Sequence, residues 1–364
     1  MEDKKYSSIH YHNYLQLDKV LDAQDLRSEE VGKPAHDEML FIIIHQVYEL
    51  WFKQIIHEMK SIMNIFQQEK VPENEIGKAV HRIRRITEIQ KVMIDQINVL
   101  ETMTPLDFLD FRNYLIPASG FQSYQFRVAE VAMGLKPEMR TTYNQKVYSK
   151  EFTEEQQKYL NDLENGDSLF DLVDRWLSRT PFIKLGDFNF KKKYLEAVSN
   201  MTEKEKETIL ETSFITDQDK EIRVKMLEQN KEYIEESLDK EKHAKSIEEG
   251  TTRLSYKATV AALMIRLYRD EPILRTPYQF IDSLVQMDEQ FTLFRYRHAQ
   301  MVMRILGKRM GTGGSSGYEY LMRTVLNHQI FRDLHNISTL MIPRSELPEL
   351  PEDIRKSLDF VYNS

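Results

Sequence analysis

Glycine and proline are scarce in this chain, and their scarcity favours long, uninterrupted elements. The 364 residues include only 12 Gly and 11 Pro, the two residues that most often interrupt helices and strands. Between them, apolar residues recur every three or four positions and do not alternate, which is the period of a helix. The sequence therefore predicts an all-α fold, and 41% hydrophobic positions are enough for a large helical bundle with a buried core.

The clearest predicted helix runs from about Asp37 to Gln67. Pro34 precedes it, and acidic residues in its first turn suit the positive end of the helix dipole. It carries two apolar rows: Leu40, Ile44, Val47, Trp51 and Ile55 in one, and Phe41, His45, Tyr48 and Phe52 in the other. Two apolar rows predict a helix that is buried on most sides.

Further helices are expected from about Glu75 to Leu100 and from about Tyr278 to Lys308. The segment from Pro105 to Met133 contains Pro117 and Gly120, so a helix there must break near these two residues.

A charged stretch follows, in which 24 of the 50 residues from 201 to 250 are Asp, Glu, Lys or Arg. This composition predicts a solvated helical pair that projects from the body, and it is compatible with partial disorder. We therefore expect a charged helical insertion at about 190–252 within a single domain that spans residues 1–364.

Composition narrows the function as well. A net charge of −8 with both signs interspersed offers no basic surface for nucleic acid. The longest apolar runs are too short to span a bilayer, so we expect no membrane partner. The absence of cysteine excludes thiolate-ligated metal sites and disulfides, and it fits a soluble protein in a reducing compartment such as the cytoplasm.

His298 interrupts an otherwise apolar row on the predicted helix at 278–308. The row, in steps of three and four, is Leu284, Met287, Phe291, Phe294, His298, Met301 and Ile305. Such a histidine is either a core residue bonded to a backbone carbonyl or the axial ligand of a b-type haem. His45, on the predicted helix at 37–67, poses the same question. Two histidines on two buried helices are the minimum for a haem pocket with a proximal ligand and a distal polar group.

Other metal sites fit the sequence less well. A di-iron bundle needs Glu-x-x-His motifs, and none of the ten histidines has Glu three residues before it. A zinc-protease helix that begins at His57 lacks its second histidine, because Ser61 stands there. The triplet His36-Asp37-Glu38 could supply two ligands of a non-haem iron site, but acids in a first turn already have a structural reason.

Two further features could contact a ligand. Five glycines crowd into residues 307–317, which predicts either a helix C-cap with a flexible linker or a loop that covers a ligand, with Thr312 among its hydroxyls. Arg112 lies between Phe108, Phe111 and Tyr114. It is either one partner of a surface salt bridge or a partly buried guanidinium suited to a carboxylate.

Five motifs resemble the tryptophan 2,3-dioxygenase family in content and order. They are YHNYLQLDKVLDAQ (11–24), HDEMLFIIIHQVYELWFKQIIHE (36–58), LDFLDFRNYLIPASGFQSYQFR (106–127), RYRHAQMVMRILG (295–307) and GTGGSSGYEYLMRT (311–324). The stretch 254–272 also resembles the longer, animal-like members, and the resemblance covers about residues 8 to 345.

The resemblance implies a haem enzyme that opens the indole ring of L-tryptophan with O2 to give N-formyl-L-kynurenine, the first step of the kynurenine pathway. It also implies a homotetramer, a dimer of dimers, with one haem b per subunit. By matching position, His298 is the proximal iron ligand and His45 accepts a hydrogen bond from the indole N–H. Arg112 and Thr312 bind the amino-acid end of the substrate, and Phe41, Phe108 and Leu115 are the walls around the indole. Tyr11 and Tyr14 close the pocket of a neighbouring subunit.

Phe294 departs from the family pattern, since some members carry Trp four residues before the haem ligand. Related indoleamine dioxygenases lack a distal histidine, so His45 favours the tryptophan-specific branch. The rival hypothesis is a haem-binding helical sensor or interaction protein without turnover, and loss of His45, Arg112 and Thr312 would mark it. All three are present.

Overall fold

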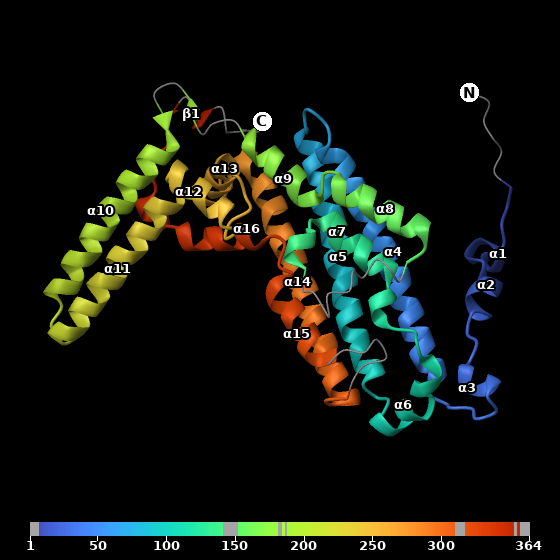
Figure 1. Cartoon of the computed structure of the whole chain (residues 1–364). Coiled ribbons are helices and arrows are strands. Elements are labelled where there is room, and N and C mark those ends of the chain that lie inside the picture. The colour runs from blue at the N-terminus through green and yellow to red at the C-terminus, as the bar shows by residue number, and fades with distance from the viewer. Residues whose placement is uncertain are drawn as a thin grey trace.

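The structure, a computed structural model, describes residues 7–140, 152–180, 184–185, 188–309, 317–352 and 355–356. Within these residues the fold is helical, and the one sheet is the antiparallel pair β1 (Lys184–Leu185) and β2 (Phe188–Asn189). The predicted all-α class is confirmed. A long helical body carries a projecting helical hairpin on one side and a slender N-terminal segment on the other (Figure 1).

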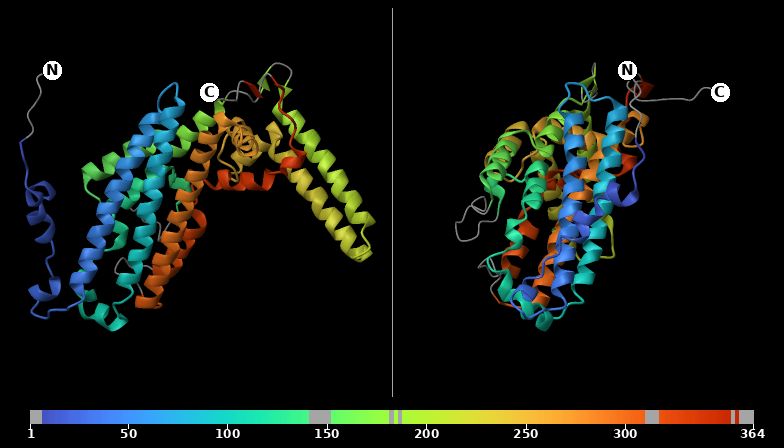
Figure 2. Two further views of the ribbon diagram at one scale, coloured as in Figure 1. Left: turned by 180° about the vertical axis from the view of Figure 1, so that it is seen from behind. Right: turned by 90° about the vertical axis from the view of Figure 1, so that its right-hand side faces the viewer.

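Three long helices, α4 (Glu38–Phe66), α5 (Glu73–Leu100) and α14 (Pro272–Leu306), form the body. Helix α5 packs against both α4 and α14, and Figure 2 shows the three side by side. The expected limits of α4 and α5 are confirmed to within about two residues, the usual uncertainty of a helix end.

The expected start of α14 at Tyr278 is wrong, because the helix begins at Pro272. Proline is well tolerated in the first turn, where its missing N–H has no helical partner. Pro277 lies inside the helix and removes one backbone hydrogen bond. The burial of Leu274, Phe280 and Ile281 against the body offsets that loss.

Aromatic and branched side chains fill the seam between these helices. Phe66 of α4 stacks on Phe280 of α14 with ring centroids 4.5 Å apart, and Trp176 of α9 (Leu169–Ser178) meets both rings edge-on. Ile55 and Ile83 are fully buried. Truncating such a ring costs about 3–5 kcal/mol, so this seam fixes how α4 and α14 face each other.

The segment after α5 breaks where expected. It comprises α6 (Pro105–Arg112), η1 (Asn113–Leu115), η2 (Gly120–Gln122), α7 (Tyr124–Met133), η3 (Pro137–Met139) and α8 (Glu154–Asn165). Thr104 and Asp107 form a capping box that starts α6. A cis peptide bond joins Ile116 to Pro117 between η1 and η2. The break separates the short helices α6 and α7, of which α7 packs against α4.

The projecting hairpin consists of α10 (Phe190–Glu211) and α11 (Asp217–Ser237), followed by α12 (Lys240–Glu248). The two long helices pack along each other and diverge from the body toward a free tip (Figure 1). The structure describes every residue from 201 to 250. Phe190, Tyr194, Val198 and Ile234 anchor the base of the hairpin in the core, whereas Phe214 at the tip is 95% exposed.

The remaining elements lie before α4 or after α12 in the chain. They are α1 (Tyr11–Leu15), α2 (Leu17–Leu21), α3 (Arg27–Glu30), α13 (Tyr256–Leu267), α15 (Gly317–Asn327), α16 (Arg332–Asn336), η5 (Ile337–Leu340) and η6 (Arg344–Glu346). Helix α13 is buried from Ala258 to Leu267. Helices α1 and α2 stand apart from the body (Figures 1 and 2).

Among the described helices, α4 is the one whose length and composition would allow it to cross a membrane. A core helix of a soluble protein can meet the same criteria, and α4 packs against α5, α7 and α9. Only 22% of its most apolar window is buried within the chain, however. Its outer side therefore leaves apolar surface uncovered.

Candidate functional site

A cavity of about 300 Å³ lies between α4, α6, α7, α14 and the start of α15. It brings together five of the residues singled out from the sequence: Phe41, His45, Phe108, Arg112 and His298. These side chains come from three helices that are far apart in the chain. The seam of α4, α5 and α14 sets their relative positions.

His298 faces this cavity from α14. In the part of the chain that the structure describes, its ring has no hydrogen-bond partner, so the backbone-bonded core histidine finds no support. Burial, and after it the positive charge that His45 can carry, lowers the pKa of His298 to about 4. The imidazole is therefore neutral at physiological pH, which is the form that binds a metal.

Phe294, the departure from the family pattern, lies one turn before His298. The two rings stack with an interplanar angle of 12° and centroids 6.2 Å apart. Phe294 also contacts the rings of Tyr48, Phe52 and Phe126. A phenyl ring thus fills this position by aromatic packing, without an indole N–H to place.

His45 enters the cavity from α4, and a backbone bond sets its tautomer. Its Nδ1 lies 2.7 Å from the carbonyl oxygen of Phe41, and a carbonyl can only accept, so Nδ1 carries the proton. Nε2 is then left as an acceptor. Burial lowers the pKa of His45, and the bond to Phe41 and the charge of Glu49 offset part of that shift. The ring is a neutral acceptor.

Aromatic rings line the wall beside His45. Phe41 lies 4.1 Å from the His45 ring, 5.7 Å from Phe108 and 5.5 Å from Phe111, measured between centroids. Phe108 meets Phe111 edge-on at 5.3 Å. Such a wall suits a flat, apolar ligand, because ring faces and edges pack against it without unsatisfied polar groups.

Arg112 ends α6 at the same cavity. Its Nε is buried and the residue as a whole is half-buried, as expected of a partly buried guanidinium. A guanidinium at an apolar wall offers a planar pair of donors to a carboxylate.

Three predicted site residues are not brought to the cavity, and a fourth lies outside the described residues. Leu115 in η1 is half-buried against the core and is not among the lining residues. Tyr11 and Tyr14 are each 70% exposed on α1, away from the body. Thr312 lies outside the described residues. Gly307, with φ +60°, follows α14 as its C-cap, which accounts for one glycine of that cluster.

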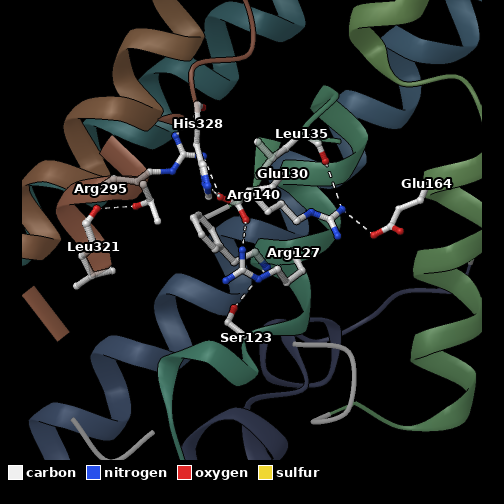
Figure 3. Close-up of polar contacts among 11 residues, drawn as sticks. Ser123, Arg127, Glu130, Leu135, Arg140, Glu164, Arg295, Leu321 and His328 are labelled. Atoms are coloured by element: carbon white, nitrogen blue, oxygen red, sulfur yellow. Dashed lines mark hydrogen bonds and ion pairs between the residues drawn. The ribbon is translucent and has the colours of Figure 1, made fainter. Parts of the chain in front are cut away.

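Sequence reasoning missed a buried ionic cluster on the far wall of the cavity. Glu130 of α7 accepts hydrogen bonds from Arg127 and from Nη2 of Arg295, the latter at 3.0 Å. Nδ1 of His328 lies 3.5 Å from the same carboxylate, and Nη1 of Arg295 donates to the His328 carbonyl at 3.3 Å. Figure 3 shows Glu130 among these three partners.

Charge decides the protonation states in this cluster. Burial alone would raise the pKa of Glu130, but Arg127, the hydrogen bond from His328 and Arg295 together bring it far below its ordinary value. Burial lowers the pKa of His328 despite its bond to Glu130. One carboxylate and two guanidiniums thus leave a surplus positive charge at the wall. The i, i+3 spacing of Arg127 and Glu130 was the available signal, but that spacing is commoner on exposed helix faces.

The competing metal sites find no support in the described residues, where no group of three His, Cys, Asp or Glu side chains could hold a metal. The carboxylate of Glu38 is fully buried and accepts from the backbone N–H groups of Arg27 and Ser28. Glu38 therefore has a structural role, which the sequence triplet His36-Asp37-Glu38 alone did not indicate.

Comparison with known proteins gives one consistent result. The family model described as tryptophan 2,3-dioxygenase matches residues 1–341. A protein of that name from Bdellovibrio bacteriovorus is 49% identical over 358 residues, 98% of this chain and 100% of the relative. Its counterparts from Alteromonas mediterranea and Dictyostelium discoideum are each 46% identical over 98% of this chain, and cover 99% and 89% of the relatives.

The buried cluster predicts a specific pH dependence of stability. Because the folded-state pKa of Glu130 is depressed, its contribution is present above the ordinary carboxyl value of 4.5 and is lost as pH falls below it. Glu130→Gln should lower the free energy of unfolding by about 3–5 kcal/mol at pH 7, since it leaves two guanidiniums without a counter-charge.

Urea titrations at pH 7 and below pH 4.5, in the same cofactor state, measure this. The gap between wild type and Glu130→Gln should narrow at the lower pH, while exposed Glu207→Gln should match wild type throughout. A gap that stays constant with pH would show that folding does not lower the pKa of Glu130.

Proposed function

Because the chain belongs to the tryptophan 2,3-dioxygenase family, we propose that it inserts both atoms of O2 across the indole 2,3-bond of L-tryptophan, giving N-formyl-L-kynurenine. The observation that carries this proposal is the cavity where His45, His298 and Arg112 meet from three helices. In this proposal His298 holds the cofactor, His45 contacts the indole and Arg112 binds the amino-acid end.

The cofactor that fits is haem b, with His298 as its proximal ligand. The fit rests on a neutral imidazole without a hydrogen-bond partner among the described residues, set in an apolar wall. When bound, the haem supplies the activation of O2. The protein supplies orientation and an apolar site that excludes water.

His45 positions the indole by hydrogen bonding. Its Nδ1 proton is held by the Phe41 carbonyl, so Nε2 is the acceptor available to the indole N–H. An indole N–H is a very weak acid, and burial makes His45 a weaker base than a free imidazole. We therefore assign His45 to orientation and hydrogen bonding, without removal of the indole proton.

Arg112 binds the substrate carboxylate, and Phe41 and Phe108 form the walls around the indole ring. Thr312 is proposed, from the family match, to complete recognition of the amino-acid end, and Leu115 to add apolar contact. The hairpin α10–α11 contributes no lining residue and lies away from α4, α6 and α7 (Figure 1), so we infer that it is an insertion in a single catalytic domain.

The active enzyme is proposed to be a homotetramer, a dimer of dimers. Exposed apolar residues on the outer faces of α4 and α5 support association: Met39, Ile43, Leu50, Val92 and Val99. The N-terminal segment is equally uncovered, with Tyr11 and Tyr14 each 70% exposed. We infer that these tyrosines close a neighbour's cavity. A cytoplasmic location is part of the proposal, since a chain without cysteine suits a reducing compartment.

The haem assignment predicts that His298→Ala folds but does not retain haem, because the variant lacks the imidazole that would hold the iron. The Soret band per mole of purified protein measures retention. His57→Ala, an exposed histidine on α4, should load normally. Unchanged haem content in His298→Ala would refute the ligand assignment, and loaded protein without turnover would favour the sensor hypothesis.

Arg112→Leu should weaken tryptophan binding by about 2–5 kcal/mol, the usual loss when one partner of a buried charge pair is removed. Tryptamine, which lacks the carboxylate, should bind both proteins nearly equally. Spectral titration of the loaded enzyme gives both affinities. Equal losses for the two ligands would contradict the carboxylate role.

The shared site predicts recovery of activity in mixed oligomers. Tyr14→Ala and Arg112→Leu subunits, each strongly impaired alone, are co-expressed. If Tyr14 acts on the neighbour, about a quarter of the wild-type activity should return, because half of the pairs are mixed and each holds one intact site. Activity equal to the average of the two parents would show that Tyr14 acts within its own subunit.

A further inference from the structure

Glu38 is a fully buried carboxylate that makes no ion pair among the described residues. It begins α4, yet both of its oxygens face the backbone of another element. Oε1 accepts from the N–H of Arg27 at 3.0 Å and Oε2 from the N–H of Ser28 at 2.9 Å. These are the first two residues of α3. A buried carboxylate needs such donors, and here the donors belong to the chain that leads to the N-terminus.

Further contacts reinforce this junction. The Oγ of Ser28, itself fully buried, accepts from the N–H of Ala35 at 3.0 Å. Upstream, Nε2 of Gln46 donates to the carbonyl of Ala23, and Nε2 of Gln24 donates to Oε1 of Gln46, both at 2.7 Å. Residues 23–35 are therefore hydrogen-bonded to α4 at two positions, Glu38 and Gln46. We name these residues the root.

Residues 7–22, which we name the arm, behave differently. Their described hydrogen bonds stay local, as between His12 and Asp18, and none of these residues is buried. Figure 1 shows α1 and α2 separated from the body. The body of its own subunit thus does not hold the arm directly. The direction in which Tyr11 and Tyr14 are presented depends on the root.

We propose that Glu38 is a positioning residue for a neighbouring subunit's active site, acting through the root and arm of its own chain. This inference rests on the proposed function, in which Tyr11 and Tyr14 close the neighbour's cavity. Glu38 touches no substrate. It fixes the backbone from which the arm departs, so the arm is oriented before the substrate binds. Closing the neighbour's cavity then costs less conformational entropy.

Replacing Glu38 by Gln keeps the shape of the side chain but changes its hydrogen-bonding groups. A carboxylate accepts at both oxygens, whereas the Gln amide accepts at one atom and donates at the other. In Glu38→Gln one backbone N–H must therefore face an NH2 group, with no acceptor. A hydrogen bond to a charged group contributes about 1.5–3 kcal/mol, which corresponds to roughly tenfold or more in the population of the held arm.

The first test compares Glu38→Gln with Glu29→Gln, an exposed position on α3 itself. In the loaded oligomer we expect Glu38→Gln to raise KM for tryptophan about tenfold, with kcat and haem content near wild type. Trypsin should cleave the arm at Lys19 faster. Glu29→Gln should match wild type. An unchanged KM with unchanged arm cleavage would overturn the proposal.

A second test removes one of the two backbone donors and leaves Glu38 in place. Arg27 is the first residue of α3 and follows Leu26, whose φ of −82° and ψ of 116° suit a residue before proline. Arg27→Pro should reproduce the KM change, because it deletes one N–H. Arg27→Ala keeps that N–H and loses only the exposed pair with Glu30, so it should match wild type. Equal KM values for both variants would contradict the proposal.

Mixed oligomers separate the arm from any effect within the same subunit. Glu38→Gln subunits are co-expressed with Arg112→Leu subunits and assayed at tryptophan well below KM, beside the Tyr14→Ala mixture. If Glu38 acts through the arm, both mixtures should recover activity above the average of their parents. Recovery with Tyr14→Ala but not with Glu38→Gln refutes this inference alone. Recovery in neither mixture refutes the shared site itself.

Discussion

The apolar packing of α4 against α5 and α14 is the constraint on which the rest of the structure depends. Ile55 and Phe66 of α4 are buried in this seam, and Phe66 stacks on Phe280 of α14. With the two helices fixed by interior packing, the row of α4 that carries His45 must face the side of α14 that carries His298. The cavity is thus a consequence of the seam.

The far wall of the cavity is held by a different force. Glu130 of α7 joins Arg295 of α14 where two guanidiniums would otherwise repel each other. A buried ionic cluster is weak evidence for stability, since desolvation offsets much of the attraction. Its geometry is nonetheless specific, because the planar donors of arginine accept few carboxylate positions. The cluster therefore sets the register of α7 on α14, while apolar burial supplies most of the free energy.

Periodicity predicted α4, α5 and the break after α6, because each depends on local spacing and on where Pro117 and Gly120 stand. It also singled out His45 and His298, since a polar residue in an apolar row is visible in the sequence. The start of α14 was mispredicted, because burial of Leu274 and Phe280 offsets the penalty of Pro277. The ionic cluster was missed because its partners are distant in the sequence, and residue roles taken from the family, such as that of Leu115, remain predictions.

Glu38 and Glu130 are both buried carboxylates, but different groups compensate them. Glu130 is compensated by side chains, which fix helices within one subunit. Glu38 is compensated by main-chain N–H groups of Arg27 and Ser28. Two such bonds orient a backbone segment, because peptide groups cannot rotate independently as side chains do. A carboxylate on the first turn of α4 therefore ties the helix that bears His45 to the path of the N-terminal arm.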